Sequence, residues 1–136
     1  MNGDLSFTVD ERAALVRVTG RGMWSAERTA THFNTLDKAL QCMRRQRGGA
    51  RVLVDLREAA VQTAQTAEVM KQWTARIYRD VDRVAVVCAT ALLALQIKHS
   101  AQVPDLATFL QVEPAQAWVL ADKAASTSAQ PVARRA

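Results

Sequence analysis

The side chains that could support chemistry in this chain are few and far apart. Cys88 ends an apolar run, and as a nucleophile it would need a base, for which His99 is the nearest candidate in sequence. A third group that would orient this pair is not evident, so we interpret Cys88 as a small buried hydrophobe. Cys42, beside Met43 in a helical pattern, is expected to pack in the same way.

The other polar candidates have simpler structural explanations. His32 and His99 lack the spacing of metal ligands, and His32 is expected on the exposed side of its helix, so we predict no metal site and no cofactor. Asp55 could act as a base or a cation ligand. A carboxylate at a strand end more often pairs with an arginine, and Arg57 and Arg83 are the candidates.

A tryptophan follows a glycine pair that only superficially resembles a phosphate loop. Gly20 and Gly22 lack the third glycine of a nucleotide-binding fingerprint, so they do not predict a nucleotide site. Trp24 comes next, directly before Ser25, which is a good helix N-cap. Two interpretations of Trp24 stay open: a hydrophobic staple, or a wall of a pocket at the carboxyl edge of a sheet.

Composition describes one ordinary globular domain. The 136 residues are 49% hydrophobic and 23% charged, and aromatic residues make up only 5%, so stacking platforms for bases or sugars are scarce. No apolar run approaches the roughly 20 residues of a membrane span, and the polar N-terminus lacks a secretory signal. Two distant cysteines do not make a disulfide framework, so we expect a cytoplasmic protein.

The net charge of +5 includes one dense basic cluster, formed by Arg44, Arg45, Arg47 and Arg51. This cluster falls where a helix ends and a strand begins, and cations there complement the negative end of the helix dipole. We therefore interpret it as a solvated helix terminus, and we predict no nucleic-acid partner.

Hydrophobic patterning supplies the elements that would position these residues. Residues 51–56 and 83–88 are apolar and rich in β-branched side chains, as in strands that are covered on both faces, and a helical pattern separates them. That is a βαβ unit, whose parallel strands carry loops at their carboxyl ends. Before this unit we expect a hairpin at 5–9 and 14–19 and a helix from Ser25 to about Arg45, which Gly48 stops. The helix within the unit is capped by Thr63 or Thr66. After the unit we expect an apolar helix at 89–99, a strand at 106–110, and a final helix with a buried stripe of Ala117, Trp118, Leu120 and Ala121.

The order β-β-α-β-α-β-α-β-α predicts an α/β fold with a single mixed, mostly parallel sheet that opens with a β-hairpin. Residues 1–123 would form the domain, and residues 124–136 are expected to be a disordered tail. This pattern resembles the STAS family (sulfate transporter and anti-sigma-factor antagonist), in its SpoIIAA-like branch, over about residues 5–122. The resemblance rests on the hairpin ending in Gly20, the long helix after it, the runs 52–56 and 82–87, and the closing 115–118 segment preceded by Phe109.

The resemblance implies a sheet with helices packed mainly on one side, and non-enzymatic work such as binding a partner protein, a nucleotide or a lipid-like ligand. The branch is similar in architecture to CRAL-TRIO lipid-transfer domains, which implies an apolar pocket. Anti-sigma-factor antagonists switch by phosphorylation in an Asp-Ser-Ser-Gly-like turn after the central strand. Residues 59–64 contain neither Asp-Ser nor Gly, and Thr63 and Thr66, which could substitute, are better explained as helix caps.

We therefore predict a non-catalytic binding or regulatory module that forms a homodimer and binds a regulatory partner protein or an apolar small molecule. The 89–99 helix, whose only charged residue is Lys98, is expected to pack in the core or at the dimer contact, and a ligand lid is the second interpretation. The alternatives are a carrier of a lipid or other apolar molecule and a phospho-regulated antagonist. A ligand would lie near the carboxyl ends of the strands, close to Trp24, Asp55, Arg57, Trp73, Cys88, Thr90, Leu92 and Leu95.

Overall fold

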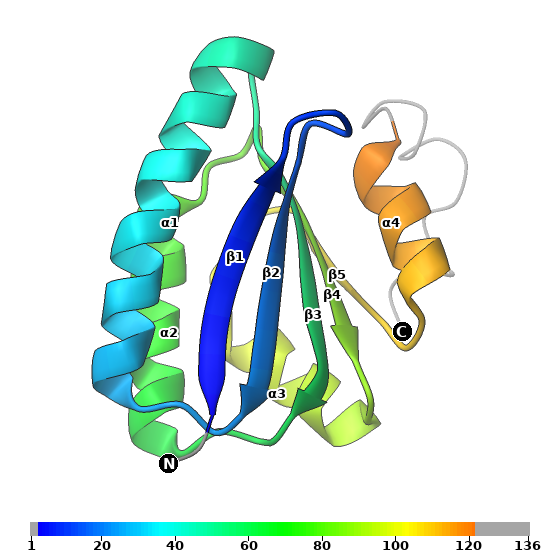
Figure 1. Ribbon diagram of the computed structural model, residues 1–136. Coiled ribbons are helices and arrows are strands. Elements are labelled where there is room, and N and C mark those ends of the chain that lie inside the picture. Colours follow the sequence, from blue (N-terminus) through cyan, green and yellow to red (C-terminus); the bar gives the residue numbers. More distant parts are fainter. Residues whose placement is uncertain (1–2, 122–136) are drawn as a thin grey trace.

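The five strands lie side by side in the order in which they occur in the chain (Figure 1). The computed structural model describes residues 3–121. Strands β1 and β2 are antiparallel, and each later strand is parallel to the one before it. The elements are β1 Asp4–Asp10, β2 Leu15–Gly22, α1 Ala26–Arg47, β3 Arg51–Ala59, α2 Ala64–Ile77, β4 Arg83–Cys88, α3 Ala91–Ser100, β5 Leu106–Phe109 and α4 Val112–Leu120. The predicted mixed, mostly parallel α/β sheet is confirmed.

Helices α1, α2 and α3 cover one face of this sheet, and α4 covers part of the other. Each crossover between parallel strands is right-handed as a rule, and each new strand adds on the same side, so the three crossover helices share a face. Figure 1 shows α1 and α2 on one side of the strands and α4 on the opposite side. The chain returns across the sheet only after β5, so the expected packing of helices mainly on one side is also confirmed.

Alternation along the strands builds two cores. Val52 and Leu56 of β3 join the larger core under the three helices, whereas Leu53 points to the smaller core under α4. Every residue of β4 is buried, as its continuous apolar run predicted. The smaller core is built around Trp118, which carries Arg83 over its ring.

Local signals set most helix ends where the sequence placed them. Ser25 accepts a hydrogen bond from the Arg28 amide at 3.0 Å, and Gly48 ends α1 with a φ of 83°. Strand β3 extends to Ala59, beyond the predicted end at Leu56, because its last residues pair with the end of β2.

The buried residues of α4 are Ala115, Trp118 and Val119, so the predicted stripe of Ala117, Trp118, Leu120 and Ala121 is right for Trp118 and wrong for Ala117 and Leu120, whose side chains are exposed. Positions 115, 118 and 119 are the ones that share a helical face toward the sheet. The predicted tail at 124–136 lies outside the described residues.

Candidate functional site

Gln62 fixes the loop between β3 and α2, where the sequence placed a possible switch. Its side chain is 5% exposed. Its Oε1 accepts from the Trp24 amide at 3.0 Å, and its Nε2 donates to the carbonyls of Gly22 at 2.9 Å and Ala60 at 2.6 Å. Its backbone exchanges two hydrogen bonds of 2.9 Å with the side chain of Gln96 on α3. One side chain therefore joins the end of β2, the loop and α3.

The two threonines after this loop are occupied by the helix cap. Thr63 is half-buried, and its Oγ1 accepts from the Thr66 amide at 3.2 Å, which confirms it as the N-cap of α2. Thr66 is 1% exposed, and its hydroxyl donates to the carbonyl of Trp24 at 3.1 Å. Phosphorylation of Thr66 would therefore require the cap to open first, because a kinase cannot reach the hydroxyl while it is buried.

Trp24 lies inside the larger core rather than at its surface. Its side chain is 2% exposed, and a Cβ added at Gly20 would come within 2.9 Å of its ring, so the glycine gives the indole its place against β2. The indole Nε1 is buried and has no hydrogen-bond partner among the described residues. Trp24 also lines a cavity of about 60 Å³ between the sheet and the three helices.

The side chains of Asp55 and Arg57 lie on the face of the sheet that α4 partly covers, opposite the larger core. They form an ion pair with each other. Arg57 Nε and Nη2 donate to the two oxygens of Asp55 at 2.9 and 2.8 Å. These hydrogen bonds hold the pKa of Asp55 below its ordinary value. The predicted pairing is with Arg57, whereas Arg83 pairs with Asp105 at 3.1 Å. Asp55 is therefore an ionised, half-buried ion-pair partner.

Cys88 and His32 are buried in the larger core and carry no charge at neutral pH. Burial raises the pKa of the Cys88 thiol to about 11, so a thiolate is scarce. His32 is 3% exposed between Phe7 and Phe33, which corrects its predicted exposed position, and desolvation lowers its pKa to about 4. Cys42 is exposed, not packed. Residues 3–121 contain no group of three histidine, cysteine or acidic side chains placed to hold a metal.

The predicted pocket set is divided among separate environments. Trp73 stacks on Phe33 at 6.5 Å between ring centroids and carries Arg76 over its outer side. Thr90 is exposed and caps α3, its Oγ1 accepting from the Leu93 amide at 3.1 Å. With Trp24 inside the core and Asp55 on the opposite face, these residues do not form one pocket.

One apolar side of helix α3 faces solvent. The sequence pattern predicted this helix in the core or at a dimer contact, with a ligand lid as the second interpretation. Leu92 and Leu95 are 65% and 53% exposed, and Leu110, just after β5, is 63% exposed. A hollow of about 260 Å³ between α3 and β5 is lined by Leu95, Phe109 and Leu110, and also by Lys98. We call this surface, formed by Leu92, Leu95, Phe109 and Leu110, the α3–β5 groove. β5 is also an outermost strand of the sheet.

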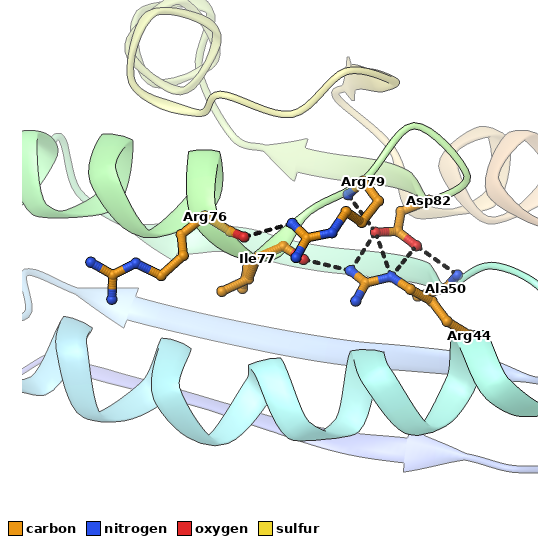
Figure 2. Close-up of polar contacts among 6 residues, drawn as sticks. All are labelled: Arg44, Ala50, Arg76, Ile77, Arg79 and Asp82. Carbon is orange, nitrogen blue, oxygen red and sulfur yellow. Dashed lines mark hydrogen bonds and ion pairs between the residues drawn. The ribbon is translucent and has the colours of Figure 1, made fainter.

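At the opposite end of the strands, Asp82 holds several chain segments together (Figure 2). Its carboxylate has no exposure and accepts from Arg44 Nη2 at 2.6 Å, and from the amides of Ala50 and Arg79 at 2.9 and 2.8 Å. Arg44 also donates to the carbonyl of Ile77 (Figure 2). The predicted solvated helix terminus is therefore wrong for Arg44, since its guanidinium is part of a largely buried network, while Arg45 and Arg47 are exposed.

Arg51, the last member of the basic cluster, attaches α4 to the sheet. Its Nη1 donates to the carbonyls of Val119 at 2.8 Å and Ala121 at 2.6 Å. Arg83 adds a bond of 3.0 Å to the carbonyl of Trp118. These carbonyls lie at the carboxyl end of α4, where partial negative charge accumulates, so both arginines serve as capping groups.

Comparisons with known proteins agree with this architecture. Residues 15–120 match the family model described as SpoIIAA-like. The structure is similar to that of an uncharacterized protein with a SpoIIAA-like fold from Shewanella loihica PV-4, with a TM-score of 0.62 and 14% identity over 86% of this chain and 93% of that chain. At that identity the similarity concerns the fold alone.

No curated protein is significantly similar to this sequence, and neither the family description nor the Shewanella structure names an activity. Within residues 3–121, no helix combines the length and the apolar character needed to cross a bilayer. The matched segment contains β2 through α4, which includes the parallel strands, the crossover helices and the returning helix. The chain therefore belongs to the SpoIIAA-like family, as its sequence pattern predicted.

Proposed function

We propose that this protein is a non-catalytic binding module that contacts a second protein chain through the α3–β5 groove. The observation that carries this proposal is the exposure of Leu95 and Leu110, which are both more than half exposed and line one hollow, together with Leu92, which is 65% exposed and lies about one helical turn before Leu95. Contiguous exposed apolar surface is unfavourable in water and typically marks an interaction site. Among the candidates for chemistry, Cys88 and His32 are buried and Asp55 is paired with Arg57, so these three side chains are not free to act on a substrate.

The partner that we propose is a second copy of this chain. β5 is a short outer strand, and the backbone groups on its outer edge can pair with the same strand of another copy in an antiparallel ladder. A two-fold axis beside β5 would bring groove against groove. Among the described residues that line the hollow, only Lys98 is charged, so self-association buries apolar surface against apolar surface without a run of like charges.

Sedimentation velocity over a concentration series, from low micromolar to several hundred micromolar, tests this proposal. We expect the wild-type chain to dimerise, and the Leu95→Glu/Leu110→Glu variant to stay monomeric because two carboxylates would enter the interface. Val81→Glu is the matched control, since Val81 is 51% exposed in the turn before β4 and away from the groove. A wild-type chain that stays monomeric throughout, or Leu variants that dimerise like the control, would refute it.

A lipid carrier receives little support from the volumes in this structure. The cavity beside Trp24 measures about 60 Å³, whereas pockets for drug-sized ligands measure about 300–1,000 Å³. Leu92 and Leu95, which were expected to lie close to such a ligand, are more than half exposed instead. A phosphoswitch at Thr63 or Thr66 would have to break the cap of α2, so we do not favour it.

A further inference from the structure

A second hollow lies where the parallel strands begin, at the end of the sheet away from the α3–β5 groove. Figure 1 shows the β1–β2 turn and the carboxyl ends of α1 and α4 together at this end of the domain. The hollow measures about 650 Å³, within the range of roughly 300–1,000 Å³ that is typical of small-molecule sites. We call it the amino-end hollow, and its wall includes Arg47, Arg51, Asp80, Val81, Arg83 and Leu120.

Three guanidinium groups on this wall keep N–H donors that no residue in 3–121 accepts from. Arg47 is exposed and has no hydrogen bond or ion pair within that range. Arg51 uses only Nη1, which holds the carboxyl end of α4, so its Nε and Nη2 stay available. Arg83, whose side chain is 2% exposed, uses Nε and Nη1 and keeps Nη2. Because a guanidinium has five N–H donors in a fixed plane, these partly used groups can still bind an anion.

Positive charge predominates around the amino-end hollow. Within residues 3–121, and leaving out the pairs Arg44–Asp82 and Asp10–Arg17, the segments that border it carry six arginines and three carboxylates: Arg12, Arg45, Arg47, Arg51, Arg79 and Arg83 against Glu11, Asp80 and Asp105. The carboxyl ends of α1 and α4 add about half a negative charge each. About two positive charges therefore remain, so this end of the domain attracts anions.

The rest of the wall is apolar and held in place. Val81 and Leu120 are 51% and 37% exposed, and both line the hollow. A Cβ at Gly49 would collide with the carbonyl of Val81, so this glycine lets the chain after α1 lie directly against the turn before β4. The carboxylate of Asp82 accepts hydrogen bonds from backbone amides of both segments (Figure 2). A wall fixed in this way loses little conformational freedom when a ligand binds.

We infer that the amino-end hollow binds a small organic acid. The carboxylate of this ligand accepts hydrogen bonds from Arg47 and Arg51, and its apolar body lies against Val81 and Leu120. A doubly charged phosphate ester suits the site less well, because phosphate sites use the amino ends of helices, whereas α1 and α4 present their carboxyl ends here. An uncharged apolar molecule would leave the guanidinium donors without an acceptor.

Sodium benzoate is the probe, because it joins one carboxylate to a flat apolar ring. We would titrate it into the isotope-labelled full chain at neutral pH and constant ionic strength, and follow the backbone amides by NMR. We expect saturable shifts of the amides of Gly48, Gly49 and Val81, which line the hollow. Benzamide keeps the ring without the charge and should bind about tenfold more weakly. Acetate keeps the charge without the ring and should bind several-fold more weakly.

Two arginines in the last turn of α1 provide matched variants. Arg47→Gln removes an exposed guanidinium from the wall of the hollow, so the dissociation constant for benzoate should rise several-fold. Arg45→Gln removes the same charge from the same helix end, but Arg45 does not line the hollow, so the dissociation constant should stay within about twofold. Both side chains are exposed, so both variants are expected to fold.

Four results would each overturn the inference: the absence of saturable shifts with benzoate, equal affinity for benzamide, equal affinity for acetate, or equal weakening by the two arginine variants. The amino-end hollow shares no described lining residue with the α3–β5 groove. A monomeric chain can therefore still bind benzoate, so failure of the proposed dimer and failure of this site are distinguishable.

Discussion

Replacing Asp82 by asparagine should cause one of the largest losses of stability available from a single polar substitution in this fold. The fully buried carboxylate accepts from Arg44 Nε and Nη2 at 3.1 and 2.6 Å, and from the amides of Ala50 and Arg79. Asparagine keeps one acceptor oxygen, but its NH₂ group replaces the second carboxylate oxygen. That NH₂ group would face N–H donors that the second oxygen had accepted from. The guanidinium of Arg44 then loses its counter-charge in a largely dry site.

The magnitude follows from the degree of burial. Removing one partner of a buried ion pair costs about 3–5 kcal/mol. The side chain of Arg44 keeps 16% exposure and can recover some hydration, so we expect about 3 kcal/mol, near the lower end. With a typical urea slope of about 1.5 kcal/mol per molar, the unfolding midpoint would fall by about 2 M.

Urea titration followed by circular dichroism at neutral pH measures this loss. A double variant that also carries Arg44→Met should recover part of it, because the unpaired charge is removed as well. Asp55→Asn breaks the exposed pair with Arg57 and is the matched control, for which we expect a much smaller change. A loss for Asp82→Asn no larger than that of the control would refute the reasoning.

Three further predictions concern the buried polar groups and the tight glycine. Burial lowers the pKa of His32 to about 4 in the folded chain, from 6.5 for a free imidazole, so the unfolded state binds a proton more readily. The unfolding free energy should therefore be highest above pH 6.5 and fall by up to about 3 kcal/mol as the pH drops toward 4, and His32→Leu should flatten this pH dependence in urea titrations. Gln62→Ala leaves the Trp24 amide and the carbonyls of Gly22 and Ala60 without the hydrogen bonds of this side chain, so the free energy of unfolding should fall by about 2–3 kcal/mol. Hydrogen exchange of the Trp24 amide should become faster, and unchanged exchange would contradict the role given to Gln62. Gly20→Ala would place a Cβ 2.7 Å from Leu56 and 2.9 Å from Trp24, so the free energy of unfolding measured by thermal unfolding should fall by about 1–3 kcal/mol. An unchanged stability would mean that the indole can shift freely.

The elements that the sequence predicted best are those in which local pattern and burial coincide. The apolar run of β4 is buried throughout, and Ser25 and Gly48 bound α1 as their chemistry favours. His32 was misplaced because Phe33, Leu36 and Leu40 suggested one narrow buried stripe. α1 contacts both β1 and α2, so its buried surface is wide enough to include the neighbouring position.

The parts of the site that escaped sequence reasoning depend on contacts between distant residues. Gln62 acts through bonds to residues 34 to 40 positions away, and nothing in its loop distinguishes it from a solvated glutamine. The exposure of Leu92 and Leu95 follows from the sheet ending at β5, so that no further strand or helix covers that side of α3 in residues 3–121. A run of apolar residues shows that a helix avoids water, but it does not show which neighbour will cover it.

The order of the strands has a consequence for how this chain folds during synthesis. Because each strand pairs with its neighbour in sequence, no strand must wait for a distant segment before it joins the sheet. The sheet can grow from the β1–β2 hairpin outward as the ribosome delivers each strand and its crossover helix. Strand β5 and helix α4 emerge after β4, so a chain that has not yet delivered them would present β4 as an apolar edge. We therefore expect nascent chains that stop before β5 to be the ones that require chaperone protection.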